Sequence, residues 1–226
     1  MKLAERVTIC EVGTRDGFQI EPEFIPTELK IEVVDRLSAT GLPRIEVTSF
    51  VSPKAVPMLR DAEAVMAGIN RRPGTRYSAL VPNDKGAVRA VDAGVDDIHT
   101  VLSASESHNL ANVNMTIAES LARLEATAQV AHRAGKPVYA GISCSFGCPF
   151  EGEVPVARLE SVVRRLVDLG AMGVETGIDL DALIETSKRV QEIVGRVLPG
   201  QIVKAGAWTR RYPLPDGVRE RVPARS

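Results

Sequence analysis

Three polar side chains that could do chemistry, Arg15, Asp16 and Gln19, follow an apolar segment near the N-terminus. The pattern at 7–12 is typical of a buried strand, and Gly13 ends it. Enzymes built on parallel sheets place their chemistry where strands end, and glycines let the backbone turn tightly beside a ligand. A surface salt bridge between Arg15 and Asp16 is almost as good an explanation, so the pattern alone favours a site only slightly.

A second candidate is Glu46, a carboxylate inside the apolar strand pattern at 45–48. Carboxylates are rarely buried unless they are paired. Arg15 could be such a partner, which would bring the two segments together. The alternative is that Glu46 points outward from a half-buried strand, and the sequence gives the two alternatives equal weight.

Metal ligands and nucleophiles are few. A single carboxylate such as Asp16 can ligate Mg²⁺ or Mn²⁺, but these ions need several oxygen ligands or waters. Cys144 and Cys148 are too few for a zinc site and have no histidine nearby in the sequence, which favours a packing role. Among the three histidines only His99, on or beside a predicted strand, is a plausible site residue, and a role in the core remains the favoured interpretation.

These side chains must be positioned by a succession of strands and helices. Apolar patterns predict strands at 7–12, 45–48, 77–81, 98–102 and 137–143, and a short one at 171–174. Caps and apolar stripes predict helices at 27–41, 56–70, 82–94, 116–135, 155–170 and 181–197. Such βα units imply a parallel sheet, either open and doubly wound or a (β/α)8 barrel. A barrel typically takes about 250 residues and eight units, so this chain is short by two or three.

Composition excludes several classes of function. With 226 residues and a net charge of −1, the chain gives no electrostatic support for binding nucleic acid or an anionic membrane. No apolar run approaches the roughly 20 residues that span a bilayer. Three cysteines and an N-terminus without signal or transit features predict a cytoplasmic protein. We expect one domain at 1–206 and a poorly ordered basic tail at 207–226, which holds five arginines and three prolines.

Four collinear stretches carry a resemblance to a known family. The stretch 11–19, EVGTRDGFQ, resembles the opening motif of the 3-hydroxy-3-methylglutaryl-CoA lyases, which belong to the metal-dependent TIM-barrel lyases and synthases. Segments 45–54, 80–83 and 143–152 are similar to the same family. The resemblance runs from about residue 7 to 172. It implies an α/β fold of the (β/α)8 TIM-barrel type, incomplete, with about five to six βα units.

The resemblance also implies a function. The family's reaction is a metal-assisted retro-aldol cleavage of an acyl-CoA to acetyl-CoA and acetoacetate, a step of leucine catabolism and ketone-body metabolism. Asp16 matches the metal-binding aspartate, for Mg²⁺ or Mn²⁺. Arg15 matches the catalytic arginine, which stabilises the enolate on the thioester oxygen. Glu46 matches a polar catalytic residue, and Arg15, Gln19 and Ser49 match substrate-binding positions.

The sequence departs from the family after about Gly173. The family's His-x-His metal ligands and its loop with a catalytic cysteine are absent, as if an internal segment were deleted. Open sheet edges would then favour a homo-oligomer. Two alternatives to the lyase remain: a related acyl-CoA condensing synthase or aldolase, and a catalytically impaired remnant or CoA-thioester-binding protein.

Overall fold

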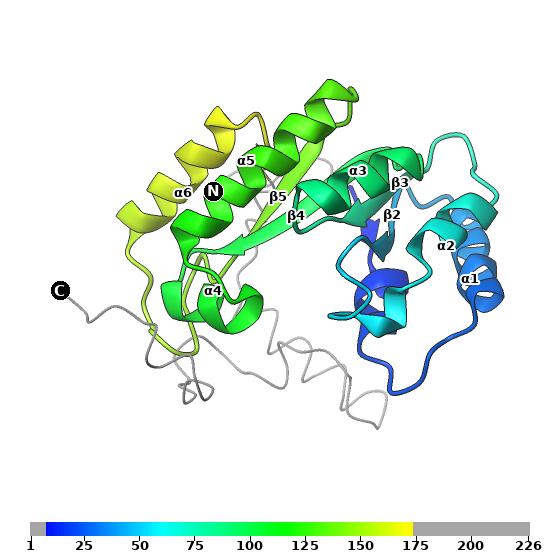
Figure 1. Ribbon diagram of the computed structural model, residues 1–226, viewed down its shortest axis with the longest axis horizontal. Helices are drawn as coiled ribbons and strands as arrows, with labels where there is room; N and C mark the ends of the chain where they lie inside the picture. Colours follow the sequence, from blue (N-terminus) through cyan, green and yellow to red (C-terminus); the bar gives the residue numbers. More distant parts are fainter. Residues whose placement is uncertain (1–7, 174–226) are drawn as a thin grey trace. The chain divides into compact units, whose positions relative to one another are not determined.

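The computed structural model describes residues 8–173, and within them strands and helices alternate along the chain (Figure 1). The strands are β1 (Cys10–Glu11), β2 (Arg44–Ser49), β3 (Arg76–Leu80), β4 (Asp97–Ser103), β5 (Val138–Ser143) and β6 (Met172–Gly173). The α-helices are α1 (Thr27–Ala39), α2 (Ala62–Gly68), α3 (Asp84–Asp92), α4 (Glu106–Val113), α5 (Ile117–Arg133) and α6 (Val156–Asp168). Two short turns of other types are the π-helix η1 (Gly13–Gly17) and the 3₁₀-helix η2 (Pro57–Leu59).

The strands form one sheet in chain order, β1-β2-β3-β4-β5-β6. The pairs β1–β2, β2–β3, β3–β4 and β5–β6 are parallel. A parallel sheet whose strands follow one another in sequence order, with helices in the connections, is the arrangement of a (β/α)8 barrel and not of a doubly wound sheet, whose order reverses. The predicted fold class is therefore confirmed, with six of the strands lying in the described residues.

Alternation along the strands separates an apolar face from a polar one. Ile45, Tyr77 and Ile98 point to one face and are buried in the main apolar core, which the helices cover. Their neighbours Glu46 and His99 point to the other face, because successive side chains in a strand alternate. The same alternation places a row of charged groups along the inner face of the sheet.

Local signals account for most of the helix boundaries. The capping box at the start of α5 is confirmed, since Thr116 Oγ1 accepts from the Glu119 backbone N–H at 3.1 Å and Glu119 Oε2 accepts from the Thr116 N–H at 2.7 Å. Asn83 caps α3 by accepting from the Gly86 N–H at 2.8 Å. These bonds satisfy backbone groups that a helix end leaves without partners.

One predicted helix was wrong and one helix was missed. The single helix expected at 56–70 is two pieces, η2 and α2, and the break lies where the Lys30 ammonium reaches the Met58 carbonyl at 2.6 Å and Asp61 Oδ1 at 2.7 Å. The helix α4 was not predicted, because its residues are mostly polar and carry no apolar stripe. Its ends nevertheless bear helix signals, a Ser105 cap and a left-handed Asn114.

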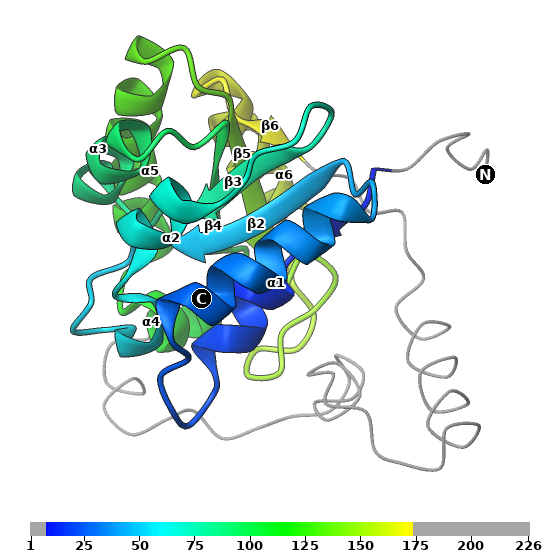
Figure 2. The same ribbon diagram turned by 90° about the vertical axis from the view of Figure 1, so that its right-hand side faces the viewer.

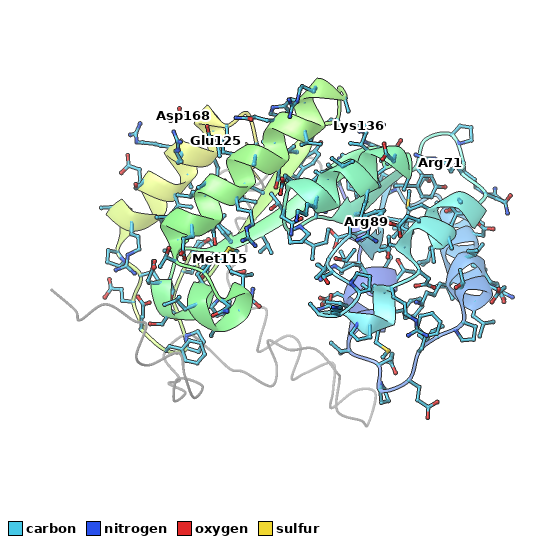
Figure 3. The ribbon with its side chains drawn as sticks, viewed as in Figure 1. Arg71, Arg89, Met115, Glu125, Lys136 and Asp168 are labelled. Carbon is cyan, nitrogen blue, oxygen red and sulfur yellow. The ribbon has the colours of Figure 1, made fainter. Side chains whose placement is uncertain are left out.

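The described residues group into two compact parts. The first comprises 8–101, 120–141 and 165–173, and the second comprises 102–119 and 142–164. In the first part α1 lies along β2 and beside α2 (Figure 2). Arg71 and Arg89, labelled in Figure 3, add links within it: Arg71 Nη1 donates to the Gly94 carbonyl and Arg89 Nε to Glu63, each at 2.6 Å.

The second part has a small core of its own. Ala104, Cys148 and Val154 are buried there, with Phe150 packed against them. Across residues 8–173, no helix combines the length and the apolar character needed to cross a membrane. The predicted helix at 181–197, the basic tail at 207–226 and the junction after Gly173 lie outside the described residues and stay predictions.

Candidate functional site

The loop after β1 is docked onto β2 by its own backbone and by one buried threonine. In η1 the N–H groups of Arg15 and Asp16 donate to the Val12 carbonyl, at 3.0 and 2.7 Å. Thr14 is buried, and its Oγ1 donates to the Glu46 carbonyl at 3.0 Å. The β1 strand therefore ends in a tight turn that presents Arg15 and Asp16 beside the middle of β2.

Glu46 is buried in β2 and lies between two cationic side chains. One carboxylate oxygen accepts a hydrogen bond from Arg15 Nε, and the other contacts His99 Nδ1. Of the two alternatives for Glu46, the structure shows the inward, paired one. Burial alone would raise the pKa of this carboxyl, but the hydrogen bond with His99 and the charge of Arg15 outweigh it and lower the pKa below its usual value.

His99 is the residue that sequence reasoning set aside. It lies on β4, where Nδ1 contacts Glu46 and Nε2 lies 3.3 Å from both Asp97 Oδ1 and Arg44 Nη1. Burial lowers the pKa of an imidazole, yet the neighbouring carboxylates of Asp97 and Glu46 raise the pKa of His99 overall. Asp97, two residues earlier on the same strand face, was the available signal, because an Asp-x-His pattern on an inward strand face brings a charged partner to the histidine.

Asp97 is itself held by several cations. Arg76 Nε donates to Asp97 Oδ2 at 2.7 Å, and Arg44 Nη1 lies 3.6 Å from Oδ1. Burial raises the pKa of Asp97, but the hydrogen bonds with His99 and Arg76 lower it overall. Both buried carboxylates, Asp97 and Glu46, are therefore charged at neutral pH, and His99 lies between them.

Asp16 is the exposed end of the cluster. Its side chain is 58% exposed, and Oδ1 accepts from Arg15 Nη1 at 2.6 Å. Among residues 8–173 no group of three or more His, Cys, Asp or Glu side chains is arranged to hold a metal ion. Because Mg²⁺ and Mn²⁺ need about six oxygen ligands, residues 8–173 do not by themselves complete a site for either ion.

The remaining predicted residues lie around this cluster without joining it. Gln19 follows η1, and its Oε1 is buried without a hydrogen bond in the part of the chain described. Ser49 ends β2, and its Oγ donates to the Leu80 carbonyl at 3.3 Å. The structure thus brings Arg15, Asp16 and Glu46 together, while among the described residues no hydrogen bond or ion pair joins Gln19 or Ser49 to them.

The cysteine loop belongs to the second compact part and has a different character. Cys148 is fully buried, and its sulfur accepts from Ser105 Oγ at 2.8 Å and from the N–H groups of Phe150 and Glu151 at 3.3 and 3.4 Å. A hydrogen bond from Cys144 and the one from Ser105 lower the pKa of Cys148 to about 5, against the effect of burial. The packing role predicted for this loop agrees with the burial of Cys148 in the small core.

Comparison with known proteins links the whole of this region to one family. The HMGL-like family model matches residues 6–197. A cytoplasmic 3-hydroxy-3-methylglutaryl-CoA lyase of Danio rerio is 44% identical over 206 residues, which are 91% of this chain and 60% of that protein. This chain therefore spans less than two thirds of the length of such relatives. Relatives named as cytoplasmic and as mitochondrial enzymes both occur.

Solved structures agree in fold. The HMG-CoA lyase of Bacillus subtilis is 41% identical with a TM-score of 0.73, covering 88% of this chain and 67% of that one. An HMG-CoA lyase from Acinetobacter baumannii, solved in complex with coenzyme A and 3-methylmalate, is 30% identical with a TM-score of 0.69, covering 92% of this chain and 97% of that one. These matches support the incomplete TIM-barrel fold of this chain.

Proposed function

This chain belongs to the HMGL-like family, and we propose that it is a carbon–carbon lyase that cleaves 3-hydroxy-3-methylglutaryl-CoA to acetyl-CoA and acetoacetate. The observation that carries the proposal is the Arg15 guanidinium, which is fixed by Glu46 directly beside Asp16 where β1 ends. The names of the relatives support the substrate, since they are hydroxymethylglutaryl-CoA lyases at 40 to 46% identity.

The proposed reaction is a retro-aldol cleavage. The 3-hydroxyl group loses its proton and becomes the ketone of acetoacetate, while the bond between C2 and C3 breaks. The electron pair of that bond moves into the thioester and leaves an enolate, which takes up a proton at carbon to give acetyl-CoA. The negative charge that grows on the thioester oxygen is what a catalyst must stabilise.

Arg15 is suited to stabilise that charge. Its Nε donates a hydrogen bond to Glu46 and its Nη1 donates one to Asp16, while Nη2 makes no hydrogen bond to the described residues. A guanidinium presents five donors in a rigid plane, so fixing two of its nitrogens fixes the direction of the third. We assign the thioester oxygen to Nη2, and we assign Gln19 and Ser49 to substrate binding.

Several further properties belong to the same proposal. Asp16 is one ligand of a divalent cation, Mg²⁺ or Mn²⁺, and the remaining ligands are not found among residues 8–173. The substrate is an acyl-CoA, which the coenzyme A complex of the Acinetobacter relative supports. We place the protein in the cytoplasm, as a homo-oligomer, with a domain at 1–206, a tail at 207–226 and a part in leucine catabolism.

A second candidate function is a CoA-thioester-binding protein that no longer cleaves its ligand. One observation favours it: among residues 8–173 no group of three or more His, Cys, Asp or Glu side chains is arranged to hold a metal ion. A condensing synthase or aldolase of the same superfamily would use the same Arg15 in the opposite direction, with acetyl-CoA and an α-keto acid as substrates.

Acetoacetate release separates these candidates. The full chain is assayed with 3-hydroxy-3-methylglutaryl-CoA and Mg²⁺ or Mn²⁺, with Asp16→Asn as the test variant and Asp92→Asn, an exposed position at the end of α3, as the matched control. Metal-dependent release that Asp16→Asn abolishes and Asp92→Asn retains supports the lyase. A well-folded chain that binds the thioester without release would support the binding protein. Condensation of acetyl-CoA with an α-keto acid, without lyase activity, would support the synthase.

A further inference from the structure

His99 is the second member of a row of five alternating charges. Starting inside the sheet, the row runs from Asp97 to His99 at 3.3 Å, then to Glu46, then to Arg15, and ends at Asp16 at 2.6 Å from Arg15. Each carboxylate in the row lies beside at least one cation. The row joins the interior of the sheet to the guanidinium that the proposed function uses.

Burial is greatest at the inner end of the row and least at its outer end. Along the row the exposed fraction of the side chain is 0% for Asp97, 17% for His99, 4% for Glu46, 18% for Arg15 and 58% for Asp16. A buried charge that loses its partner costs far more than an exposed one. The side-chain positions of Asp97, His99 and Glu46 are therefore strongly constrained. Glu46 in turn constrains the position of the Arg15 guanidinium.

Charged groups surround His99 from β2 and from its own strand. Glu46 and Arg44 approach from β2, and Asp97 lies on β4 itself. The Tyr139 ring on β5 meets the imidazole edge-on with the ring centroids 5.6 Å apart. Two further groups act less directly. Arg76 forms an ion pair with Asp97, and burial together with the charge of Glu46 raises the pKa of the Cys10 thiol on β1. The Glu46 carboxylate is the nearest partner of Nδ1, whereas Asp97 Oδ1 and Arg44 Nη1 both lie 3.3 Å from Nε2.

We propose that His99 is a positioning residue for Arg15, acting as an imidazolium that holds the Glu46 carboxylate in the one orientation that fixes the guanidinium. This inference rests on the proposed function, because it concerns the group assigned to the thioester oxygen. The two oxygens of Glu46 divide the work: Oε2 is held by His99 and Oε1 holds Arg15. Without His99 the carboxylate has one charged partner and can rotate about its last bond.

The first test needs no variant. In the wild-type chain labelled with ¹⁵N-histidine, NMR at neutral pH should show both ring nitrogens of His99 protonated, with the Nδ1 proton protected from exchange by Glu46. His132, an exposed histidine of α5, provides the contrast and should exchange freely. A neutral His99 whose Nδ1 carries no proton would overturn the proposal.

The second test measures whether His99 affects the affinity for a ligand whose negative charge lies where we place the enolate oxygen. Carboxymethyl-CoA, a stable thioether, carries a carboxylate where the enolate develops, and acetyl-CoA carries a neutral thioester. For His99→Leu we expect affinity for carboxymethyl-CoA to fall about tenfold, the equivalent of about 1.4 kcal/mol, while acetyl-CoA changes by less than about twofold. His99→Asn, whose amide can replace Nδ1, should recover most of the loss, and the control His132→Asn should lose nothing.

Each outcome decides between the two claims. Equal losses for both ligands in His99→Leu, or no loss for either, would overturn the positioning role. A wild-type chain that binds neither ligand would count against the proposed function. The role of His99 would then be decided by the hydrogen-exchange rate of the Arg15 Nε proton, measured by NMR. That proton should exchange slowly in the wild type and in His132→Asn, and rapidly in His99→Leu. If His99→Leu does not fold, His99→Asn and the wild-type histidine spectrum still decide the question.

Discussion

Replacing Glu46 by Gln removes a negative charge from between two cations and leaves the size of the side chain unchanged. Arg15 and His99 are largely buried, so neither can recover its lost partner from water. Removing one partner of a buried ion pair typically costs about 3–5 kcal/mol. The amide oxygen of Gln keeps one of the two hydrogen bonds, so we expect the lower part of that range, about 3 kcal/mol, as the loss in the free energy of unfolding.

A matched control comes from the surface of the same part of the chain. Glu32 and Arg36 form an ion pair one helical turn apart in α1, with side chains 51% and 77% exposed. Exposed pairs of this kind contribute only about 0.3–0.5 kcal/mol. Glu32→Gln makes the same chemical change as Glu46→Gln, so the difference between the two variants isolates the effect of burial between cations.

Urea denaturation followed by far-ultraviolet circular dichroism measures both variants against the wild type. The free energy of unfolding is extrapolated linearly to zero urea, and the slope shows whether the denatured state has changed. A difference of about 2–3 kcal/mol between the two variants, with unchanged slopes, is the expected result. A Glu46→Gln variant within about 1 kcal/mol of Glu32→Gln would refute the claim that the Arg15–Glu46–His99 cluster is tightly determined.

Three further predictions concern pH, a thiol and a glycine. The pKa of His99 is raised in the folded chain, so the stabilisation that the protonated ring provides is complete below the ordinary histidine pKa and is lost as pH rises through the raised value. The melting temperature of the wild type should therefore fall relative to that of His99→Leu from neutral to alkaline pH. Parallel curves of melting temperature against pH would contradict this. Cys148 has a pKa of about 5, so the thiolate absorbance of the native chain at neutral pH should drop in Cys148→Ser, and an unchanged absorbance would show that the thiol is protonated. A Cβ on Gly86 would lie 2.7 Å from the Phe50 carbonyl oxygen, whereas one on Gly17 meets nothing within 4 Å. In thermal denaturation Gly86→Ala should lower the free energy of unfolding by about 1–3 kcal/mol, and Gly17→Ala should lower it little. Equal losses in the two variants would rule out the close contact.

Much of this fold could be predicted because its signals are local. Apolar strand patterns and caps such as the Thr116 box depend on residues a few positions apart. The break between η2 and α2 depends instead on Lys30, which reaches Met58 from another helix. The polar helix α4 lacks the apolar stripe that a sequence pattern needs. Polar contacts between residues far apart in the sequence, and helices without an apolar face, are therefore the features that the sequence does not predict.

The candidate site divides in the same way. Arg15 and Asp16 stand together in a glycine-flanked loop, and Glu46 stands out as a carboxylate in an apolar strand, so each could be found from its own neighbours. His99 meets Glu46 from 53 residues away, and a lone histidine beside a strand is more often part of a core. Its importance depends on the pairing of β2, β3 and β4, which places its ring against a carboxylate.

The most direct test of the central claim is the rate of acetoacetate release by the wild type and by Arg15→Lys, compared as kcat/KM. Lysine keeps the charge but lacks the planar fork that contacts Glu46 and Asp16 and that we assign to the thioester oxygen. Loss of a fixed donor to a developing oxyanion typically costs about 10²–10³-fold in rate, so we predict at least about a hundredfold fall for Arg15→Lys. An Arg15→Lys variant that retains activity within about threefold of the wild type, or a folded wild type that releases no acetoacetate, would contradict the account.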